Sequence, residues 1–349
     1  MGSRYKWFLL ILTITICSFL YRLYKLNTYH FGKNISLEIT QEKTEAVPNI
    51  LKQVMDSGII FVETTDKVEP TPLAVCSVES AARSNPDKHV YYFMKGFSGK
   101  LSQYPQPDYT GIPLLSAISN VVLLPLKLSE LFEHTPLYEW HQKVNPDLQK
   151  YQFHILADGC RLALLWKYGG TSLDTDIISM KPLPFDNFTT LQNEESFSNA
   201  VMGFHLKHHQ FVMECMKDFI WRHQGPELIT RVLKRWCKFN DTDIFTGKRC
   251  NGISLWMPRR FYPIPYQSCE RYYEPWKKED IGRLLSGTYG AHVWNEMNSS
   301  MKKKVIAGSG SLIEHLFQKY CPTTYRNLIQ SPENAEPVRA RDFGDERRH

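Results

Sequence analysis

The sequence predicts an α/β domain with a mainly parallel central sheet whose two faces are covered by helices. Short apolar runs typical of buried strands, at residues 58–64 and 89–94, alternate with longer segments of helical periodicity. A hydrophobic content of 42% and a charged content of 22% are those of a folded protein, which excludes collagen-like, disordered and multi-span membrane classes. The length of 349 residues fits two domains, or one large domain with additions.

The strongest predicted helix covers residues 153–168. Its apolar stripe includes Leu162 and Leu165, and Gly169 follows where a helix commonly ends in a left-handed residue. A strand is expected directly afterwards, at residues 171–173. The other expected elements are a helix that begins near residue 72, a strand within 117–124, and packing helices at about 210–222 and 226–237.

An uncharged, mostly apolar run covers residues 7–21 and is flanked on both sides by arginine and lysine. We interpret residues 7–24 as a single transmembrane signal-anchor helix and residues 1–6 as a cytoplasmic tail. The run is shorter than the roughly 20 residues of a typical spanning helix, but flanking basic side chains can extend outward to the membrane surface. A cleavable signal peptide is the alternative, although no clear small-residue cleavage site follows the run.

The rest of the chain divides by composition. Residues 25–57 are polar and mixed in charge, which is typical of a stem between a membrane and a folded domain. Residues 331–349 are charged and poor in large apolar side chains, so they are expected to be disordered. The folded domain is therefore expected at residues 58–330.

Glycosylation motifs and cysteines indicate an oxidising compartment of the secretory pathway. Asn-x-Ser/Thr acceptor motifs occur four times, and seven of the eight cysteines lie outside the predicted anchor. An odd number leaves at least one thiol unpaired or intermolecular, and we choose Cys160 because it lies inside the strongest helix. The pairing of the others stays open. The four acceptor residues are Asn34, Asn187, Asn240 and Asn298.

Two carboxylates follow the strand predicted at residues 171–173. Asp174 and Asp176 are two residues apart, so both point to the same side if the chain stays extended. Two neighbouring oxygens can hold Mg²⁺ or Mn²⁺ and leave coordination positions for a diphosphate. The net charge of +6 suits an anionic ligand, but it falls short of the basic footprint of a nucleic-acid-binding protein, and no nucleic-acid partner is expected.

Asp158 and Arg161 give this acidic pair a polar context. They lie three residues apart on the helix predicted at 153–168, so both side chains project from one face, opposite most of the apolar stripe. A carboxylate and a guanidinium held together can bind sugar hydroxyls through charged hydrogen bonds. A structural ion pair at the surface is the alternative.

The segment ADGCRLALLWKYGGTSLDTD, residues 157–176, resembles the D-x-x-R…GG-x-x-x-D-x-D signature of DXD sugar transferases. Over about residues 58–326, the chain resembles the lactosylceramide 4-alpha-galactosyltransferase and alpha-1,4-N-acetylglucosaminyltransferase family. Agreement at several separated segments makes this resemblance far more specific than the acidic pair alone. The segments are CSVESAAR (76–83), HQGPELITRVLKRWC (223–237), FYPIP (261–265), HVWN (292–295) and YCPTT (320–324).

The resemblance implies a GT-A fold, which is a Rossmann-like nucleotide-sugar transferase domain, in a single-pass type II Golgi membrane enzyme with a luminal catalytic domain. It also implies a UDP-sugar donor and Mn²⁺ as cofactor, with Mg²⁺ as the alternative. Asp174 and Asp176 would bind the metal and through it the diphosphate, whereas Asp158 and Arg161 would contact the donor sugar. The metal would act as a Lewis acid on the departing UDP.

The expected reaction is α1,4-transfer of galactose, or of an N-acetylhexosamine, to a β-linked galactoside or hexosamine terminus of a glycolipid such as lactosylceramide. Transfer of N-acetylglucosamine or N-acetylgalactosamine to glycoprotein or glycolipid glycans is the alternative, because a few pocket contacts distinguish these sugars. A non-catalytic luminal sugar-binding protein is a further alternative, which the intact acidic motif disfavours. The α-linked products imply retention of configuration, and we favour a front-face path because no carboxylate stands out as a nucleophile.

Three further residues are candidates for the site. Related folds often bring a C-terminal histidine back to the cation, so His292 is a candidate third metal ligand, with a partly buried structural histidine as the alternative. Trp294 is expected to shape the donor pocket, and core packing is its alternative role. Asn199 is our candidate for a catalytic polar group near the sugar.

Two other motifs favour a structural role. His205, His208 and His209 have the spacing of metal ligands, and we interpret them as the solvated start of a helix. Gly225-Pro226 stands where backbone N–H groups of the following helix can face a substrate, and we interpret it as the start of that helix.

Overall fold

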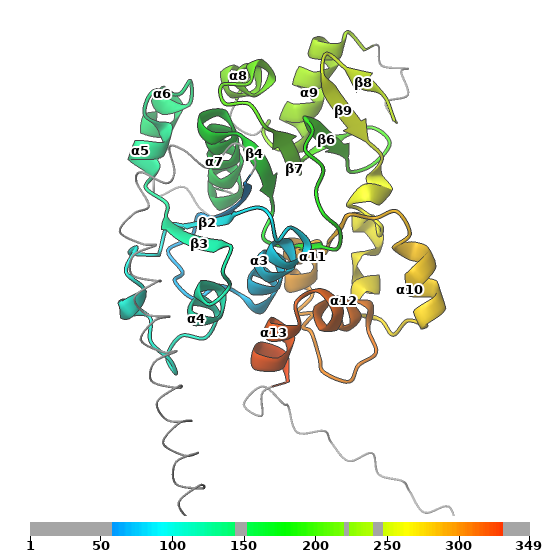
Figure 1. Cartoon of the computed structure of the whole chain (residues 1–349). Coiled ribbons are helices and arrows are strands. Elements are labelled where there is room, and N and C mark those ends of the chain that lie inside the picture. Colours follow the sequence, from blue (N-terminus) through cyan, green and yellow to red (C-terminus); the bar gives the residue numbers. More distant parts are fainter. Residues whose placement is uncertain (1–57, 144–151, 220–222, 240–246, 331–349) are drawn as a thin grey trace, which may run out of the picture. The chain divides into compact units, whose positions relative to one another are not determined.

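The computed structural model describes residues 58–143, 152–219, 223–239 and 247–330 (Figure 1). The predicted cytoplasmic tail, anchor and stem lie outside these ranges, as do the predicted C-terminal tail and the acceptors Asn34 and Asn240. Among the described residues, no helix combines the length and the apolar character needed to cross a membrane.

An eight-stranded sheet of order β3-β2-β1-β4-β7-β6-β9-β8 runs through the domain. Its first four strands are parallel to one another, which confirms the parallel sheet predicted for this part of the chain. The strands are almost wholly buried, as expected for a sheet whose two faces are covered. They are β1 (Ile59–Glu63), β2 (Val90–Met94), β3 (Val121–Pro125) and β4 (Gly170–Leu173).

The other half of the sheet is mixed. β7 runs antiparallel to both β4 and β6, β9 is parallel to β6, and β8 is antiparallel to β9. The direction reverses at the short connection between β6 and β7, where Asn193 Oδ1 accepts hydrogen bonds from two backbone N–H groups. The strands are β6 (Phe188–Leu191), β7 (Phe197–Phe204), β8 (Arg249–Cys250) and β9 (Ile253–Trp256).

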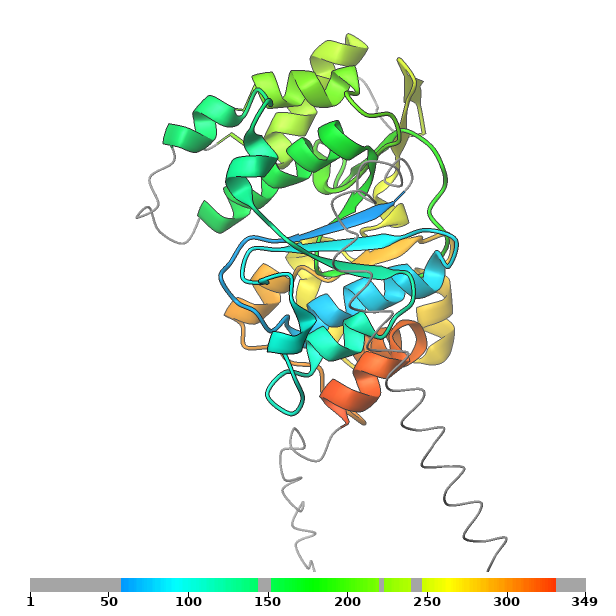
Figure 2. The same cartoon turned by 60° about the vertical axis from the view of Figure 1, so that its left-hand side comes forward.

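Helices cover both faces of the sheet (Figure 2). On one face, α7 (Gln152–Tyr168) contacts β1 and β4, and α9 (Pro226–Cys237) contacts β7. On the other face, α3 (Pro72–Ser84) contacts β2, and α4 (Gly111–Ser116) contacts β3. The predicted α/β architecture with two covered faces is therefore confirmed.

The predicted helices agree with the structure except at some boundaries. α7 and α9 match their predicted ranges to within one residue. α8 (Gln210–Lys217) is shorter than the predicted 210–222, of which residues 220–222 lie outside the described ranges. The strand expected within 117–124 begins only at Val121, because the preceding residues form α4 and a turn.

The C-terminal part of the domain joins the first part through a second, two-stranded sheet and a disulfide. β10 (Gly290–His292) pairs antiparallel with β5 (Ile177–Ser179), just after the acidic motif. The bond Cys76–Cys321 links α3 to the end of α12 (Leu312–Tyr320). A second disulfide, Cys237–Cys250, links α9 to β8.

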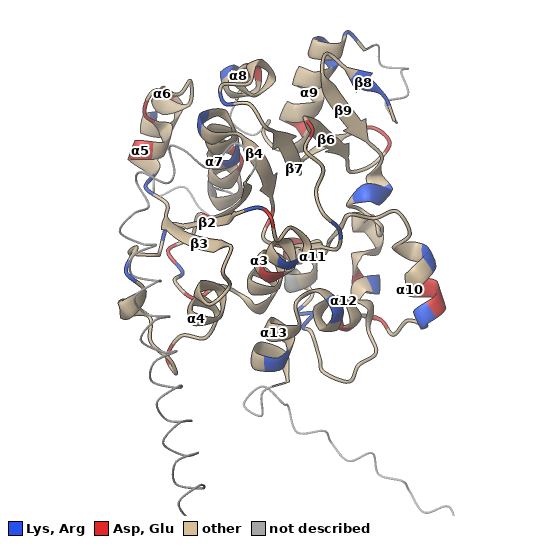
Figure 3. Cartoon of the chain, in the orientation of Figure 1, with Lys and Arg blue, Asp and Glu red and all other residues tan. Residues whose placement is uncertain are grey.

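Cys160 is buried and free, as predicted. Cys215 and Cys269 are also buried and free. The other α-helices in the described part of the chain are α5 (Leu128–Phe132), α6 (Tyr138–Lys143), α10 (Lys278–Leu284), α11 (Asn295–Ser300) and α13 (Pro322–Thr324). Figure 3 shows acidic and basic residues spread over the domain, including both signs on α10 at its edge.

Candidate active site

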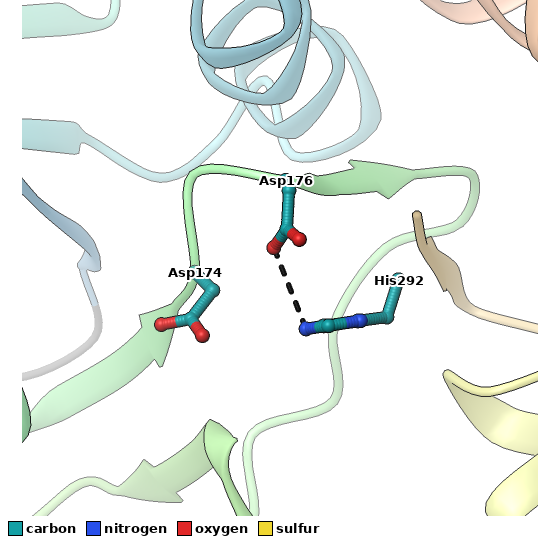
Figure 4. A group of neighbouring side chains, drawn as sticks. All are labelled: Asp174, Asp176 and His292. Carbon is teal, nitrogen blue, oxygen red and sulfur yellow. Dashed lines mark ion pairs between the residues drawn. The ribbon is translucent and has the colours of Figure 1, made fainter. Parts of the chain in front are cut away.

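The acidic motif lies on the turn between β4 and β5, at the carboxyl end of β4 (Figure 4). The Asp174 N–H donates to the Ala200 carbonyl on β7, and the Ile177 N–H donates to the Asp174 carbonyl, so the turn is fixed at both ends. The order of the strands reverses between β1 and β4, because β2 and β3 lie on the far side of β1 from β4. Open α/β sheets bind ligands at the carboxyl ends of the strands at such a reversal of strand order.

His292 lies beside the two aspartates, as predicted, and we call these three side chains the cation cluster. Asp174, Asp176 and His292 each offer one ligand atom, and these atoms all lie within 4.8 Å of one another. The Nε2 atom of His292 lies 3.4 Å from Asp176 Oδ1 (Figure 4). The register of β10 against β5 causes this approach, because it pairs His292 with Ile177, the residue after Asp176.

The backbone around Trp294 clamps Asp176. The Val293 N–H donates to the Asp176 carbonyl, and the Asn295 N–H donates to Asp176 Oδ2 at 2.9 Å. Trp294, between these two donors, has a φ of +59°, in the left-handed region that bulky residues rarely adopt. This conformation reverses the chain so that His292 and Asn295 both reach one carboxylate. The backbone donor at Asn295 is a site contact that the sequence analysis missed.

Aromatic packing orients the His292 ring. Trp294 lies edge-on to it with ring centroids 4.3 Å apart, and the Tyr262 centroid is 5.3 Å away. His292 Nδ1 is buried and has no hydrogen-bond partner within the described part of the chain. Most ligating histidines are oriented by a hydrogen bond at the second nitrogen, so here packing takes over that role.

Tyr262 was missed as a site residue, although it belongs to the FYPIP segment that carries the family resemblance. Its hydroxyl donates to Ser198 Oγ at 2.5 Å, next to Asn199 on β7. The indole N–H of Trp294 donates to the Ile264 carbonyl at 2.8 Å. The structure therefore places Trp294 against His292, and its contact with a donor sugar stays a prediction.

Arg161 joins the cation cluster to Asp158. Its guanidinium forms ion pairs with Asp174 and Asp158 through separate nitrogens, and the residue is only 8% exposed. Asn199 Nδ2 donates to Asp158 Oδ1 at 2.5 Å. Four predicted site residues thus form one connected network, which consists of Asp158, Arg161, Asp174 and Asn199. The alternative of a surface ion pair is wrong, because the pair is buried.

Burial and neighbouring charges shift the pKa values of the residues in this network. Burial alone would lower the pKa of Arg161, but Asp174 and Asp158 outweigh this effect and raise it, so the guanidinium stays charged. Burial raises the pKa of Asp174 to about 6, against the opposing influence of Arg161 and with a further upward contribution from Asp176. Burial likewise raises the pKa of Asp158, while Arg161 and Asn199 act against it. Crowded buried carboxylates of this kind are stabilised by a cation.

Gly225 keeps space open beside the network. Its φ is +62°, and a Cβ at this position would lie 3.3 Å from Asp158 Oδ2 and 3.5 Å from Asn199 Oδ1. Neither oxygen accepts a hydrogen bond from the described residues, so both can accept one from a bound hydroxyl. Gly225-Pro226 does begin α9, as predicted, and Gly225 also borders the site, which is close to the alternative position facing a substrate.

The histidine motif is structural, although its predicted solvation is wrong for one member. His205 is buried and stacks on the Phe185 ring with centroids 3.9 Å apart. His209 caps α8, because its Nδ1 accepts a hydrogen bond from the Phe211 N–H. His208 packs edge-on against Trp166.

The predicted glycosylation of Asn298 is wrong for the folded domain. The residue is fully buried, and its Nδ2 donates to the Val293 and Cys269 carbonyls. A glycan on that nitrogen would have no room. Asn187 is half-buried, with its Oδ1 accepting from the His205 N–H, and its glycosylation stays a prediction.

Known families match both halves of the domain. Residues 72–198 match the glycosyltransferase sugar-binding region containing DXD motif, and residues 204–328 match the alpha 1,4-glycosyltransferase conserved region. The α/β fold, the cation cluster and these matches define a DXD glycosyltransferase.

Curated relatives cover most of the chain. It is 44% identical over 285 residues to alpha-1,4-N-acetylglucosaminyltransferase of Homo sapiens, which is 80% of this chain and 82% of that protein. It is 41% identical over 279 residues to lactosylceramide 4-alpha-galactosyltransferase of Homo sapiens, which is 78% of this chain and 77% of that protein. The chain belongs to the alpha 1,4-glycosyltransferase family. The UDP-sugar-dependent hexosyltransferase predicted from the sequence is thereby confirmed.

Solved structures show remoter likenesses. The PaToxG glycosyltransferase aligns with a TM-score of 0.39 and 15% identity, covering 59% of this chain and 78% of that chain. The galactosyltransferase LgtC, in complex with donor and acceptor sugar analogues, aligns with a TM-score of 0.33 and 13% identity, covering 71% and 97%.

Proposed function

We propose that the protein is a retaining α1,4-glycosyltransferase that moves galactose from UDP-galactose to a β-linked galactoside terminus of a glycolipid such as lactosylceramide. One observation carries the proposal: Arg161 couples a cation cluster to Asp158 and Asn199, which offer free oxygens for sugar hydroxyls. A cation site and a hydroxyl site side by side fit a diphosphate and the sugar attached to it. The 41% identity to a lactosylceramide 4-alpha-galactosyltransferase supports this donor and acceptor.

Transfer of an N-acetylhexosamine to a glycoprotein or glycolipid glycan is the second candidate. The 44% identity to an alpha-1,4-N-acetylglucosaminyltransferase supports it. The sugars differ at C2 and C4, and substituents there are distinguished by a few contacts in the donor pocket. An acetamido group at C2 needs more room than a hydroxyl.

The residues present fit a divalent cation, and we propose Mn²⁺. Asp174 and Asp176 would provide hard oxygen ligands and His292 would provide a nitrogen. Mg²⁺ prefers an all-oxygen shell, so the imidazole disfavours it relative to Mn²⁺. When bound, the cation would supply Lewis-acid stabilisation of the departing diphosphate.

Residues of the network would orient the donor sugar. Arg161 and the Asn199 amide hold Asp158 Oδ1, which leaves Asp158 Oδ2 facing the space beside Gly225. Hydroxyls bound there fix the sugar so that the acceptor hydroxyl approaches from the side of the leaving group. The C1–phosphate oxygen bond breaks, the C1–acceptor oxygen bond forms on the same face, and the acceptor proton passes to the phosphate. Configuration is retained without an enzyme nucleophile.

We also propose a Golgi membrane location with a type II anchor at residues 7–24 and a luminal catalytic domain. The disulfides Cys76–Cys321 and Cys237–Cys250 support an oxidising compartment. The short apolar run of the predicted anchor suits a thin membrane. Protease treatment of sealed microsomes tests the topology, because a luminal domain is protected and a cytoplasmic one is degraded.

The function is tested with the full-length protein in detergent, Mn²⁺, a lactoside acceptor and each UDP-sugar in turn. We expect acceptor-dependent transfer from UDP-galactose, detected together as UDP release and as the mass increase of one hexose. Asp176→Asn should lower the transfer rate by roughly a thousandfold, whereas the exposed Asp108→Asn is a matched loss of charge and should have no effect. A mass increase of one N-acetylhexosamine instead would establish the second candidate. Failure of every donor to transfer would refute both.

A further inference from the structure

An exposed segment beside the site combines large apolar side chains with lysines. Met297, Met301 and Ile306 are 46%, 45% and 61% exposed. Between the last two lie three consecutive exposed lysines. We call residues 297–306 the rim segment. Its lysines are Lys302, Lys303 and Lys304.

The rim segment begins at the cation cluster. It follows Asn295, the first residue of α11, whose N–H donates to Asp176 Oδ2. The Met301 N–H donates to the Met297 carbonyl, so the helical turn continues and the two side chains share one face. The apolar face therefore lies within about two helical turns of the proposed cation ligands.

A second element places another apolar side chain at the same edge. Glu296 Oε1 lies 3.4 Å from His154 Nε2, in the first turn of α7. Phe153, next to His154, is an exposed large hydrophobic residue. α7 therefore carries an exposed large hydrophobic residue one position from the ion pair that joins it to α11.

The charge of this surface is positive. Residues 295–310 contain three lysines and one acidic residue, Glu296. Apolar side chains that enter the headgroup region, combined with lysines that attract anionic lipids, are the two features by which a protein surface binds a bilayer interface. Long lysine side chains can reach headgroups while methionines lie deeper. This charge and apolar pattern fits a phospholipid surface, whose headgroups present phosphates to the lysines.

We propose that the rim segment docks on the membrane leaflet that holds the acceptor, with its apolar side chains in the bilayer interface and its lysines against the phosphates of the lipid headgroups. The proposal rests on the proposed function, and it narrows the acceptor to a lipid-linked sugar. Docking at this edge would bring the cation cluster to the height at which a glycolipid presents its terminal sugar.

Docking is tested first without any activity measurement. A polarity-sensitive fluorophore is attached to Met301→Cys in the full-length protein, and vesicles of phosphatidylcholine are compared with vesicles that also contain phosphatidylserine. We expect a blue shift of emission that is larger with the anionic lipid. Leu206→Cys is the matched control, because Leu206 is 68% exposed and follows β7 at the end that pairs with the start of β4, away from Asp174. An equal shift at both positions, or none at Met301→Cys, would overturn the proposal.

The same fluorescent label distinguishes membrane docking from self-association of the protein. A shift that appears in vesicle-free buffer as protein concentration rises would show that a second copy covers the rim segment, which also overturns the proposal. Lys303→Ala/Lys304→Ala should weaken the anionic-lipid dependence by about fivefold for each lysine removed.

Activity provides the second test. We expect Met297→Ser/Met301→Ser to lower kcat/KM about tenfold for a glycolipid embedded in vesicles and to leave kcat/KM unchanged for a water-soluble lactoside. Leu206→Ser should leave both unchanged. Equal losses on both acceptors would indicate damage to the site and contradict docking. If the wild-type protein transfers to neither acceptor, the proposed function fails, whereas the fluorescence result still decides the docking surface.

Discussion

The two regions that build the site do so by different means. In the DXD region, Asp158 and Arg161 come from α7 and Asp174 directly follows β4, the next strand, and ion pairs with the buried Arg161 hold them together. In the C-terminal region, His292 and Asn295 return to Asp176 from far along the chain, and Asn295 is 119 positions after Asp176 in the sequence. Sheet register and aromatic packing hold these residues in place.

The difference separates two kinds of dependence. A buried charge network needs all of its members, because removing one leaves another uncompensated. A ligand held by backbone pairing can change its side chain while the pairing persists. Substitutions in the DXD region should therefore lower both stability and activity, whereas substitutions of His292 should lower cation binding while folding is kept.

Arg161→Met should have the largest effect. It removes the buried countercharge of Asp158 and Asp174, whose side chains are only 13% and 24% exposed, and breaking a buried pair in this way costs about 3–5 kcal/mol. Denaturant unfolding measures the loss. Arg249→Met is the matched control, since the Arg249 side chain is 62% exposed in its ion pair with Asp186 and its loss should cost about 0–1 kcal/mol. Similar losses for the two variants would contradict the central role of Arg161.

Asp176→Asn should lower the transfer rate by roughly a thousandfold, because it removes a proposed cation ligand and the charge that receives His292 and the Asn295 N–H. Its stability should change far less than that of Arg161→Met. Initial rates and unfolding curves of the same preparation separate the two effects. A rate within tenfold of the wild type would exclude Asp176 as a ligand.

His292→Ala should weaken cation-dependent UDP binding by about 10–100-fold, the range expected when a ligand or its support is lost. Isothermal titration of UDP at several Mn²⁺ concentrations measures it. The exposed His134→Ala provides the comparison and should bind UDP as the wild type does. Loss of folding in His292→Ala would contradict the expectation that substitutions of His292 lower cation binding without affecting the fold.

Glu314→Gln should have the smallest effect, which depends on pH. Burial alone would raise the pKa of Glu314, but hydrogen bonds from the Tyr325 hydroxyl and the Gly308 and Gly310 N–H groups outweigh it, so the pKa is lowered. The carboxylate therefore stabilises the fold above its unfolded pKa of about 4.3, and this contribution is lost as pH falls through the lower folded value. We expect a deficit of about 1–2 kcal/mol at pH 7 that shrinks below about pH 4.3.

Denaturant unfolding of the wild type and of Glu314→Gln, at about pH 7 and at about pH 3, measures this deficit. A difference that stays constant down to pH 3 would show that the charge of Glu314 is not responsible. The result sharpens the comparison, because Glu314 stabilises the C-terminal region at the loop before α12, away from the cation cluster.

Sequence spacing could predict the local part of the site but not the distant part. Asp158 and Arg161 share a helix face, and Asp174 and Asp176 follow a strand, so short-range periodicity was sufficient for them. His292 could be predicted only through family resemblance, because its approach depends on the register of β10 against β5. The backbone donor at Asn295 depends on one left-handed residue, for which a tryptophan gives no signal.

The fold, too, could be predicted from the sequence only in its local parts. The parallel strands and α9 follow from apolar runs and helix-start residues, whereas the reversal between β6 and β7 depends on an asparagine turn that resembles many other loops. The acceptor motif at Asn298 carries no information on burial, which tertiary packing decides. Gly225 likewise gains its role only when α9 meets Asp158.

The most direct test asks whether the two regions share one cation. Electron spin echo envelope modulation of Mn²⁺ bound to the full-length protein detects nitrogen-14 from a coordinated imidazole. The account predicts this modulation in the wild type and its loss in His292→Gln, with Mn²⁺ still bound through Asp174 and Asp176. Bound Mn²⁺ without nitrogen modulation in the wild type, or modulation that persists in His292→Gln, would contradict it.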